Sequence, residues 1–247
     1  MGYFTVTVEP TMVASKQHTA AFSAKDILFD WTSFDMPKGT SKLIDVVLVA
    51  RGTDGVYQEK DTVIYFAKTK DSGTTAPSSI GTVNATANGV GYFDHVIGAI
   101  QVSATDFKEG LDSLSVASLG HGAATNQGPN LLLHGEPDSG TNVGYDKLYV
   151  AATCGAYDFR SGMQVNETTF AAGAQTTITV DGVDATLAFA PGDVIHAHDD
   201  AVLGTVSSIT NATTIVLTAA NTAAIENNDY LYNITPIKII LCFDDGK

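Results

Sequence analysis

Positive charge, cysteine and tryptophan are all scarce in this sequence. Lys and Arg number 13 against 27 Asp and Glu, which gives a formal net charge of −14 and a pI near 4.5. Such a protein lacks the basic face that nucleic-acid phosphates and anionic lipid headgroups require, so we expect no nucleic-acid partner and no membrane partner. The apolar runs are also far shorter than the roughly 20 residues of a membrane-spanning helix.

Only two cysteines are present, Cys154 and Cys242, and each lies in an apolar run typical of a strand. Two isolated thiols do not have the spacing of a zinc site. We expect two buried free thiols, and a disulfide between them is the alternative in an oxidising compartment. The first residues lack the basic and apolar regions of a signal peptide, so we do not expect secretion by that route.

Charged residues make up only 16% of the chain, compared with about 25% in a typical globular protein. Thr, Ser, Asn and the 23 Gly must therefore supply much of the polar surface. Thr packs well on a pleated sheet and Gly permits tight turns, so this balance favours strands over helices. A chain of 247 residues is long enough for one large domain, or for one domain and a smaller one.

Apolar and β-branched runs predict strands through the first part of the chain, at residues 27–35, 43–50, 62–68, 93–102, 111–119, 131–134 and 148–157. Residues 1–25 alternate loosely, with Tyr3, Thr5 and Thr7 against Phe4, Val6 and Val8, and are typical of a short edge strand or an arm. One helical turn is expected within residues 104–110. Trp31 is the only tryptophan, and we expect it to anchor the core.

The strand spacing changes near residue 168. Short strands are expected at residues 177–180, 185–189, 194–197, 203–209, 214–217 and 230–234, with a helical turn at 219–225. Six short strands in about 65 residues are typical of a small barrel. The last apolar run, at 237–243, is similar to that at 43–50, so we expect the chain to return there to its first domain.

These patterns together predict a mainly β protein, with an antiparallel β-sandwich or jelly-roll-like main domain and a small inserted β-barrel. The main domain comprises residues 1–167 together with 236–247, and the inserted barrel comprises residues 168–235. Such insertions are tolerated where the two ends of the inserted segment leave the host domain close together.

His196 and His198 are the residues that most suggest a metal site. Residues i and i+2 of a strand share a face, so both imidazoles could reach one metal, with Asp199 or Asp200 as a third ligand. The other interpretation is a strand that ends in a polar Asp-Asp turn. Two histidines without a distant third ligand match a metal site poorly, so we expect no metal and no cofactor.

The sequence contains no complete catalytic motif. A Ser-His-Asp arrangement would have to combine His121 or His134 with Ser118 or Ser139, and no Gly-x-Ser-x-Gly elbow supports it. Glycine motifs that bind phosphate or dinucleotides are absent as well. We therefore expect no enzymatic activity and no catalytic residues.

Three tyrosines in the middle of the chain raise the alternative of sugar binding. Tyr145, Tyr149 and Tyr157 recur at spacings of four and eight residues. Tyrosines in strands generally pack within the protein, whereas exposed loop tyrosines can stack on a sugar ring. A carbohydrate-binding module is therefore one of the functions that the sequence leaves open.

Two stretches of the chain resemble known virion proteins. Residues 30–39, Asp-Trp-Thr-Ser-Phe-Asp-Met-Pro-Lys-Gly, followed by Leu-Ile-Asp-Val-Val at 43–47, are similar to the amino-terminal part of structural proteins from tailed phages of marine bacteria, including cyanobacteria. The run from Pro-Gly-Asp-Val-Ile at 191–195 to Asn-Asp-Tyr-Leu-Tyr at 228–232 resembles small β modules that recur in phage virion proteins. This second resemblance covers about a quarter of the chain.

The resemblance implies a structural component of the virion, and most of all a capsid decoration protein. Such a protein binds the major capsid protein on the outside of the shell, and copies of itself, most naturally as a trimer at three-fold positions. It would be made in the host cytoplasm and end on the capsid exterior. The apolar segment from Tyr3 to Val13 would be an arm that pairs with a neighbour's sheet edge. The alternatives are a tail, neck or baseplate component, and a carbohydrate-binding module for host attachment.

Overall fold

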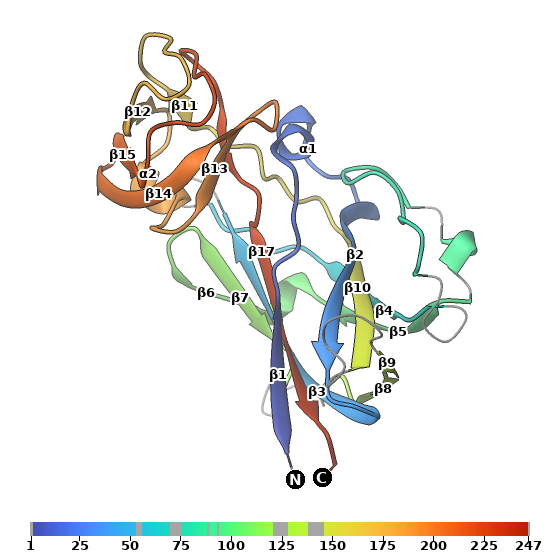
Figure 1. The fold of residues 1–247 in the computed structure, drawn as a ribbon. Coiled ribbons are helices and arrows are strands. Elements are labelled where there is room, and N and C mark those ends of the chain that lie inside the picture. The colour runs from blue at the N-terminus through green and yellow to red at the C-terminus, as the bar shows by residue number, and fades with distance from the viewer. Residues whose placement is uncertain are drawn as a thin grey trace.

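The computed structural model describes residues 2–52, 56–69, 76–87, 89–92, 94–120, 128–137 and 146–246. The fold is mainly β, with 49% strand and 7% helix, which confirms the predicted class. All strand pairs are antiparallel, and they form three sheets (Figure 1). Among the described residues, no helix is both long and apolar enough to cross a membrane.

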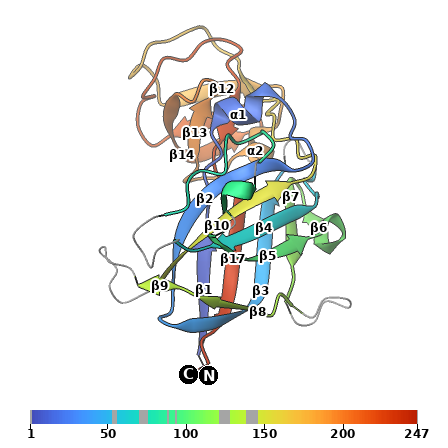
Figure 2. The same cartoon turned by 90° about the vertical axis from the view of Figure 1, so that its right-hand side faces the viewer.

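Two of the sheets form the main sandwich. The first has the order β1 (Tyr3–Val8), β17 (Ile237–Asp244), β3 (Thr40–Arg51), β7 (Leu114–Ser118), β6 (Phe107–Leu111), with β8 (Leu131–His134) also paired to β3. The second has the order β2 (Asp26–Met36), β10 (Asp146–Cys154), β4 (Thr62–Ala67), β5 (Val96–Val102), with β9 (Glu136–Pro137) paired to β10. In Figure 2 the second sheet faces the viewer with the first sheet behind it, and the third sheet lies above both.

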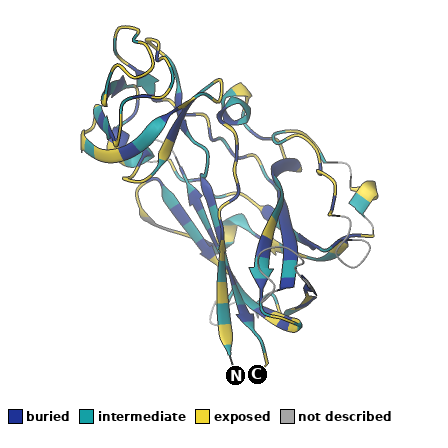
Figure 3. Cartoon of the chain, viewed as in Figure 1, coloured by how far each residue is buried: buried dark blue, intermediate teal, exposed yellow. Residues whose placement is uncertain are grey.

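Strict alternation of side chains positions the core between these two sheets. Along β17, Ile237, Ile239, Leu241 and Phe243 point inward and are buried, while the residues between them are half-exposed (Figure 3). Phe243 stacks on Phe34 of the opposite sheet, with ring centroids 6.3 Å apart. The period-two pattern of the sequence therefore fixes which face of the strand joins the core.

Trp31 does not lie in this core, contrary to the prediction. The side chain is half-buried on the outer face of the second sheet, in a small cluster with Ile27, Ile80 and Ala151. Its ring meets that of Tyr92 edge-on, with centroids 6.0 Å apart. Tyr92 belongs to the short helix η1 (Val90–Tyr92), in a segment that covers this face. This cover explains why β10 is buried on both faces at Val150, Ala151 and Ala152.

The third sheet is a nearly closed, barrel-like module. Its order is β11 (Gln164–Val165), β12 (Thr177–Asp181), β15 (Thr214–Leu217), β14 (Val202–Asn211), β13 (Val194–Ala197), β16 (Leu231–Asn233). An additional bridge between Gln164 and Tyr230 connects its two ends. It has an apolar cluster of its own, which begins at Met163 and ends at Leu231. The sheet therefore starts four residues before the boundary predicted at 168.

Two local predictions in this module are wrong. Residues 185–189 were expected to be a strand, but α2 (Ala185–Ala188) is a short helix, because the Asp184 side chain accepts a hydrogen bond from the Thr186 backbone N–H at 2.8 Å. Residues 219–225 were expected to form a helical turn, but they run as an irregular loop. The buried Asn221 side chain holds this loop by donating to the carbonyls of Ala171 and Ala223.

Two further helices lie outside the barrel. The 3₁₀ helix η2 (Ala104–Asp106) occupies part of the helical turn expected at 104–110, and a capping box between Ser103 and Asp106 begins it. The helix α1 (Ala14–Thr19) was not anticipated. It follows β1 and packs against β16 of the barrel.

The predicted N-terminal arm is part of the molecule's own sheet. β1 pairs with β17 over its whole length, from Tyr3 opposite Asp244 to Val8 opposite Ile239. The backbone N–H of Gly2 also donates to the Asp245 carboxylate. The two chain ends therefore lie together at the end of the sandwich opposite to the barrel (Figure 1), and β1 is not a free arm.

Candidate functional site: the junction between sandwich and barrel

The histidines proposed for metal binding do not converge. β13 ends at Ala197, so His198 lies in the following turn and does not share the strand face of His196. His196 is buried and its Nδ1 lies 3.2 Å from the backbone oxygen of Asp200. Asp199 is exposed and accepts from the Ala201 backbone N–H. Within the described residues, no three His, Cys, Asp or Glu side chains are grouped as metal binding would require.

His198 instead faces a histidine from a distant part of the sequence. Its ring centroid lies 5.1 Å from that of His18 on α1, and the rings are tilted by 49°. His18 also contacts the rings of Tyr230 and Tyr232, and its Nδ1 lies 2.8 Å from the Tyr232 hydroxyl. On the other side, His198 Nδ1 lies 3.7 Å from the Asp229 carboxylate. Sequence reasoning missed this cluster because its members are separated by about 180 positions.

Other predicted site residues are isolated from one another. His134 is exposed and hydrogen-bonds through Nδ1 to the Thr40 hydroxyl, whereas Ser118 bonds to Asp45. His121 and Ser139 lie outside the described residues. The structure therefore does not bring a serine to a histidine at either of the described positions.

The tyrosines proposed for sugar stacking are packing residues where the structure describes them. Tyr149 is 9% exposed and Tyr157 is fully buried. Tyr157 stacks on Phe159 with centroids 5.2 Å apart, and its hydroxyl donates to the carbonyl of Lys60. Tyr145 lies outside the described residues. Tyr149 and Tyr157 therefore give no support to a sugar-binding surface.

The two thiols are free and belong to different sheets. Cys154 on β10 is buried, and Cys242 on β17 is half-buried, so only the first matches the expectation of burial. Burial, with the Asp26 carboxylate nearby, raises the pKa of the Cys154 thiol to about 12. Burial followed by the charge of Asp45 also raises the pKa of Cys242. Neither thiol is activated as a nucleophile, since the thiolate is the reactive form.

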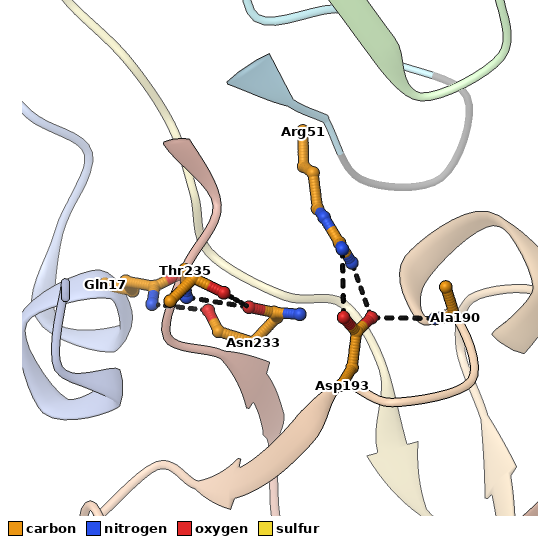
Figure 4. A network of polar contacts seen from close by, with 6 residues as sticks. All are labelled: Gln17, Arg51, Ala190, Asp193, Asn233 and Thr235. Atoms are coloured by element: carbon orange, nitrogen blue, oxygen red, sulfur yellow. Dashed lines mark hydrogen bonds and ion pairs between the residues drawn. The ribbon is translucent and has the colours of Figure 1, made fainter. Parts of the chain in front are cut away.

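The most elaborate polar arrangement lies where the barrel meets the sandwich (Figure 4). Arg51, at the end of β3, donates two hydrogen bonds to the Asp193 carboxylate of the barrel, at 2.5 and 2.9 Å. Asp193 also accepts from the Ala190 backbone N–H at 2.7 Å. The Asp193 side chain is only 11% exposed, so this bidentate pair is partly shielded from water.

A second connection ties α1 to the strand that leaves the barrel. The buried Gln17 side chain donates to the backbone oxygens of Met12 and Asn233, at 2.7 and 2.8 Å. The Asn233 side chain accepts from the backbone and hydroxyl of Thr235, which fixes the turn into β17 (Figure 4). These bonds hold two segments that are far apart in the sequence, residues 12–17 and 233–235, at one point.

Beside the Arg51–Asp193 pair is a cleft of about 640 Å³. Its walls come from both modules and include Glu9, Arg51, Phe189, His196 and Lys238. The charge of Arg51 is already matched by Asp193, so the wall does not present it as an unpaired cation. This arrangement joins the two modules, and the described residues around it do not form a nucleophile–base pair.

No family model, no curated protein and no solved structure matches this chain. The geometry of the junction and the two-module architecture are therefore the observations on which a function must be argued.

Proposed function

We propose that this protein is a structural component of a phage virion, and specifically a non-enzymatic capsid decoration protein. The observation that carries the proposal is the arrangement of the two β modules. The barrel lies at one end of the sandwich and both chain termini lie at the other (Figure 1). A molecule built in this way offers two well-separated surfaces, one for attachment to a shell and one that projects from it.

The charge supports an exterior position. A net charge of −14 disfavours contact with packaged DNA and keeps decorated particles dispersed.

The proposed partners are the major capsid protein and further copies of this chain, most naturally as a trimer, with no nucleic acid and no membrane. The protein is made in the host cytoplasm and ends on the capsid exterior. Because β1 is paired within the chain, attachment uses other surfaces than an N-terminal arm.

The proposal is tested by quantifying the proteins of purified virions and by imaging the particle at subunit resolution. A decoration protein is expected at an abundance close to that of the major capsid protein, with density on the shell at symmetry-related positions. Density on the tail alone, with an abundance tens of times lower, would instead establish the tail, neck or baseplate alternative. Complete absence from the virion would exclude both.

The sugar-binding alternative is tested separately on a glycan array. We expect no reproducible binding, because Tyr149 and Tyr157 are buried against other parts of the sandwich. Sugar-specific binding that competes with the free sugar would favour a host-attachment module.

A further inference from the structure

The helix α1 connects the two modules. It lies between β1 and β2 in the sequence, yet it contacts β16 of the barrel. The backbone N–H and the hydroxyl of Ser15 both donate to the Asp200 carboxylate, at 2.8 and 2.6 Å. Gln17 adds its bond to the Asn233 carbonyl. The short helix α1 is therefore a second polar link between the sandwich and the barrel, beside the Arg51–Asp193 pair.

The side of α1 that faces the barrel carries His18, whose ring lies against the ring of His198. The centroid distance of 5.1 Å leaves no space for a counter-ion between the two rings. His18 is half-buried and its nearest polar partner, the Tyr232 hydroxyl, is neutral. The Asp229 carboxylate lies 3.7 Å from His198 Nδ1. A positive charge on His198 therefore has a carboxylate nearby, whereas a positive charge on His18 faces a second imidazole.

The charged and titratable groups around the pair come from four segments. They are Lys16 on α1, Asp199 and Asp200 in the turn after β13, Asp229, Tyr230 and Tyr232 at the start of β16, and Asp158 and Arg160 in the segment that leads into the barrel. Asp200 is engaged by Ser15, and Asp158 by Arg160. None of these carboxylates is placed between the two rings.

We propose that His18 and His198 form a pH-sensitive clamp that holds α1 on the barrel at neutral pH and releases it on acidification. When both imidazoles are neutral they pack against each other and against the two tyrosines. When both are protonated, two like charges lie about 5 Å apart, and α1 leaves the barrel surface. The Arg51–Asp193 pair keeps the modules together, so the release is local.

The direction of the pH dependence follows from the burial of His18. Loss of solvent, followed by the neighbouring His198 charge, lowers the pKa of His18 below its ordinary value of 6.5. The unfolded or released state therefore binds the proton more tightly than the docked state does. The stability that neutral His18 contributes to docking is fully present above pH 6.5 and is lost as the pH falls from there through the lowered pKa of His18.

Hydrogen–deuterium exchange of the full chain tests the clamp. The amides of residues 14–19 are compared at about pH 7.5 and about pH 5, after correction for the intrinsic pH dependence of exchange. We expect these amides to exchange about tenfold faster at the lower pH, within the range that repulsion of like charges at this distance produces. Exchange in β13 and β14 should change little, because the barrel itself stays folded.

The variants His18→Gln and His198→Gln each remove one of the two charges and retain a side chain that can hydrogen-bond. Both should abolish the acceleration at low pH. His134→Gln is the matched control, because His134 is exposed and contacts Thr40 away from the barrel, so it should behave as the wild type.

Two results would overturn the clamp. One is equal protection of α1 at both pH values in the wild type, and the other is acceleration that persists in both glutamine variants. Release of α1 already at neutral pH in both variants would show that the packed neutral imidazoles hold the helix, as the clamp requires, and exchange of the wild type at about pH 5 would still test its release by charge.

Discussion

Asp193 accepts three hydrogen bonds where the two modules meet. It receives two hydrogen bonds from Arg51 of the sandwich and one from the Ala190 backbone within the barrel. It follows Pro191 and Gly192, a pattern that reads as a turn in the sequence. Nothing in that pattern shows that the carboxylate would also bind an arginine more than 140 positions away.

Replacing Asp193 should therefore destabilise the protein. In Asp193→Ala, the partly buried Arg51 guanidinium and the Ala190 N–H lose their acceptor, and we expect the free energy of unfolding to fall by about 2 kcal/mol. Denaturant unfolding measures the change. Arg160→Ala is the control, since its pair with Asp158 is exposed and local, and no measurable loss is expected. Equal losses in the two variants would show that the Arg51–Asp193 pair contributes no more to stability than an exposed ion pair does.

The thiols provide a second test at the same scale. A pKa of about 12 leaves Cys154 almost entirely protonated at pH 8, and burial also blocks access to it. We expect a thiol reagent to leave Cys154 unmodified in the native protein, to react slowly with Cys242, and to titrate two free thiols after unfolding without reductant. Rapid native reaction in a Cys242→Ala variant would contradict the burial of Cys154. Detection of only one or no thiol after unfolding would contradict the absence of a disulfide.

At the scale of elements, β1 is the edge strand that was one of the two predictions for the N-terminal segment, and it is not a free arm. Val8 is 4% exposed and joins the main apolar cluster, while Phe4 and Val6 pack against its edge. Removing residues 2–9 should lower the free energy of unfolding by about 3 kcal/mol, because that apolar surface and the whole β17 edge become exposed. Thermal unfolding measures this loss of stability.

Thr5→Ala and Thr7→Ala serve as controls for this deletion. Both threonines are exposed on the same strand, so their replacement should change stability by no more than about 0.5 kcal/mol. A truncated chain with wild-type stability would show that β1 does not contribute to the stability of the sandwich and is a detachable arm.

The strands with long apolar runs were the part of the fold that the sequence predicted well. β17 has an uninterrupted inward-facing row of Ile, Leu and Phe, and β3 buries Leu43, Val46, Leu48 and Ala50 on the same side of the sheet, which leaves little choice of face. The failures occur where a single polar side chain decides the local conformation. Asp184 caps α2 and Asn221 holds the loop after β15, and neither effect can be deduced from hydrophobic periodicity.

The candidate site could be predicted even less, for a related reason. The pair His196 and His198 was selected because strand periodicity places i and i+2 on one face, but β13 ends between them. His198 then contacts His18, and Arg51 contacts Asp193, both across the boundary between modules. The scarcity of arginine was the one available signal, since Arg51, one of only two arginines in the chain, lies at the junction. Pairings between distant segments depend on the tertiary arrangement, which one sequence does not contain.

At the scale of the whole molecule, the strands of the barrel are inserted in the sequence between β10 and β17 of the sandwich. Its apolar residues form their own group, distinct from that of the sandwich. The segments that enter and leave it run side by side, because the Leu231 N–H donates to the Met163 carbonyl and the Val165 N–H to the Asp229 carbonyl. A short linker can therefore span the gap that removal of the barrel would leave.

We expect the sandwich to fold without the barrel. The chain in which residues 164–233 are replaced by a short Gly-Ser linker should be monodisperse and show cooperative thermal unfolding with a β-type circular dichroism spectrum. It should be less stable than the full chain, because Arg51, Gln17 and α1 lose their partners. Introducing Arg51→Ala into this deletion chain should cause no further loss, whereas in the full chain it should destabilise, since Asp193 is present only there. A remainder that is unfolded would show that the two clusters form one cooperative unit, with the junction as part of its core rather than a contact between two independent modules.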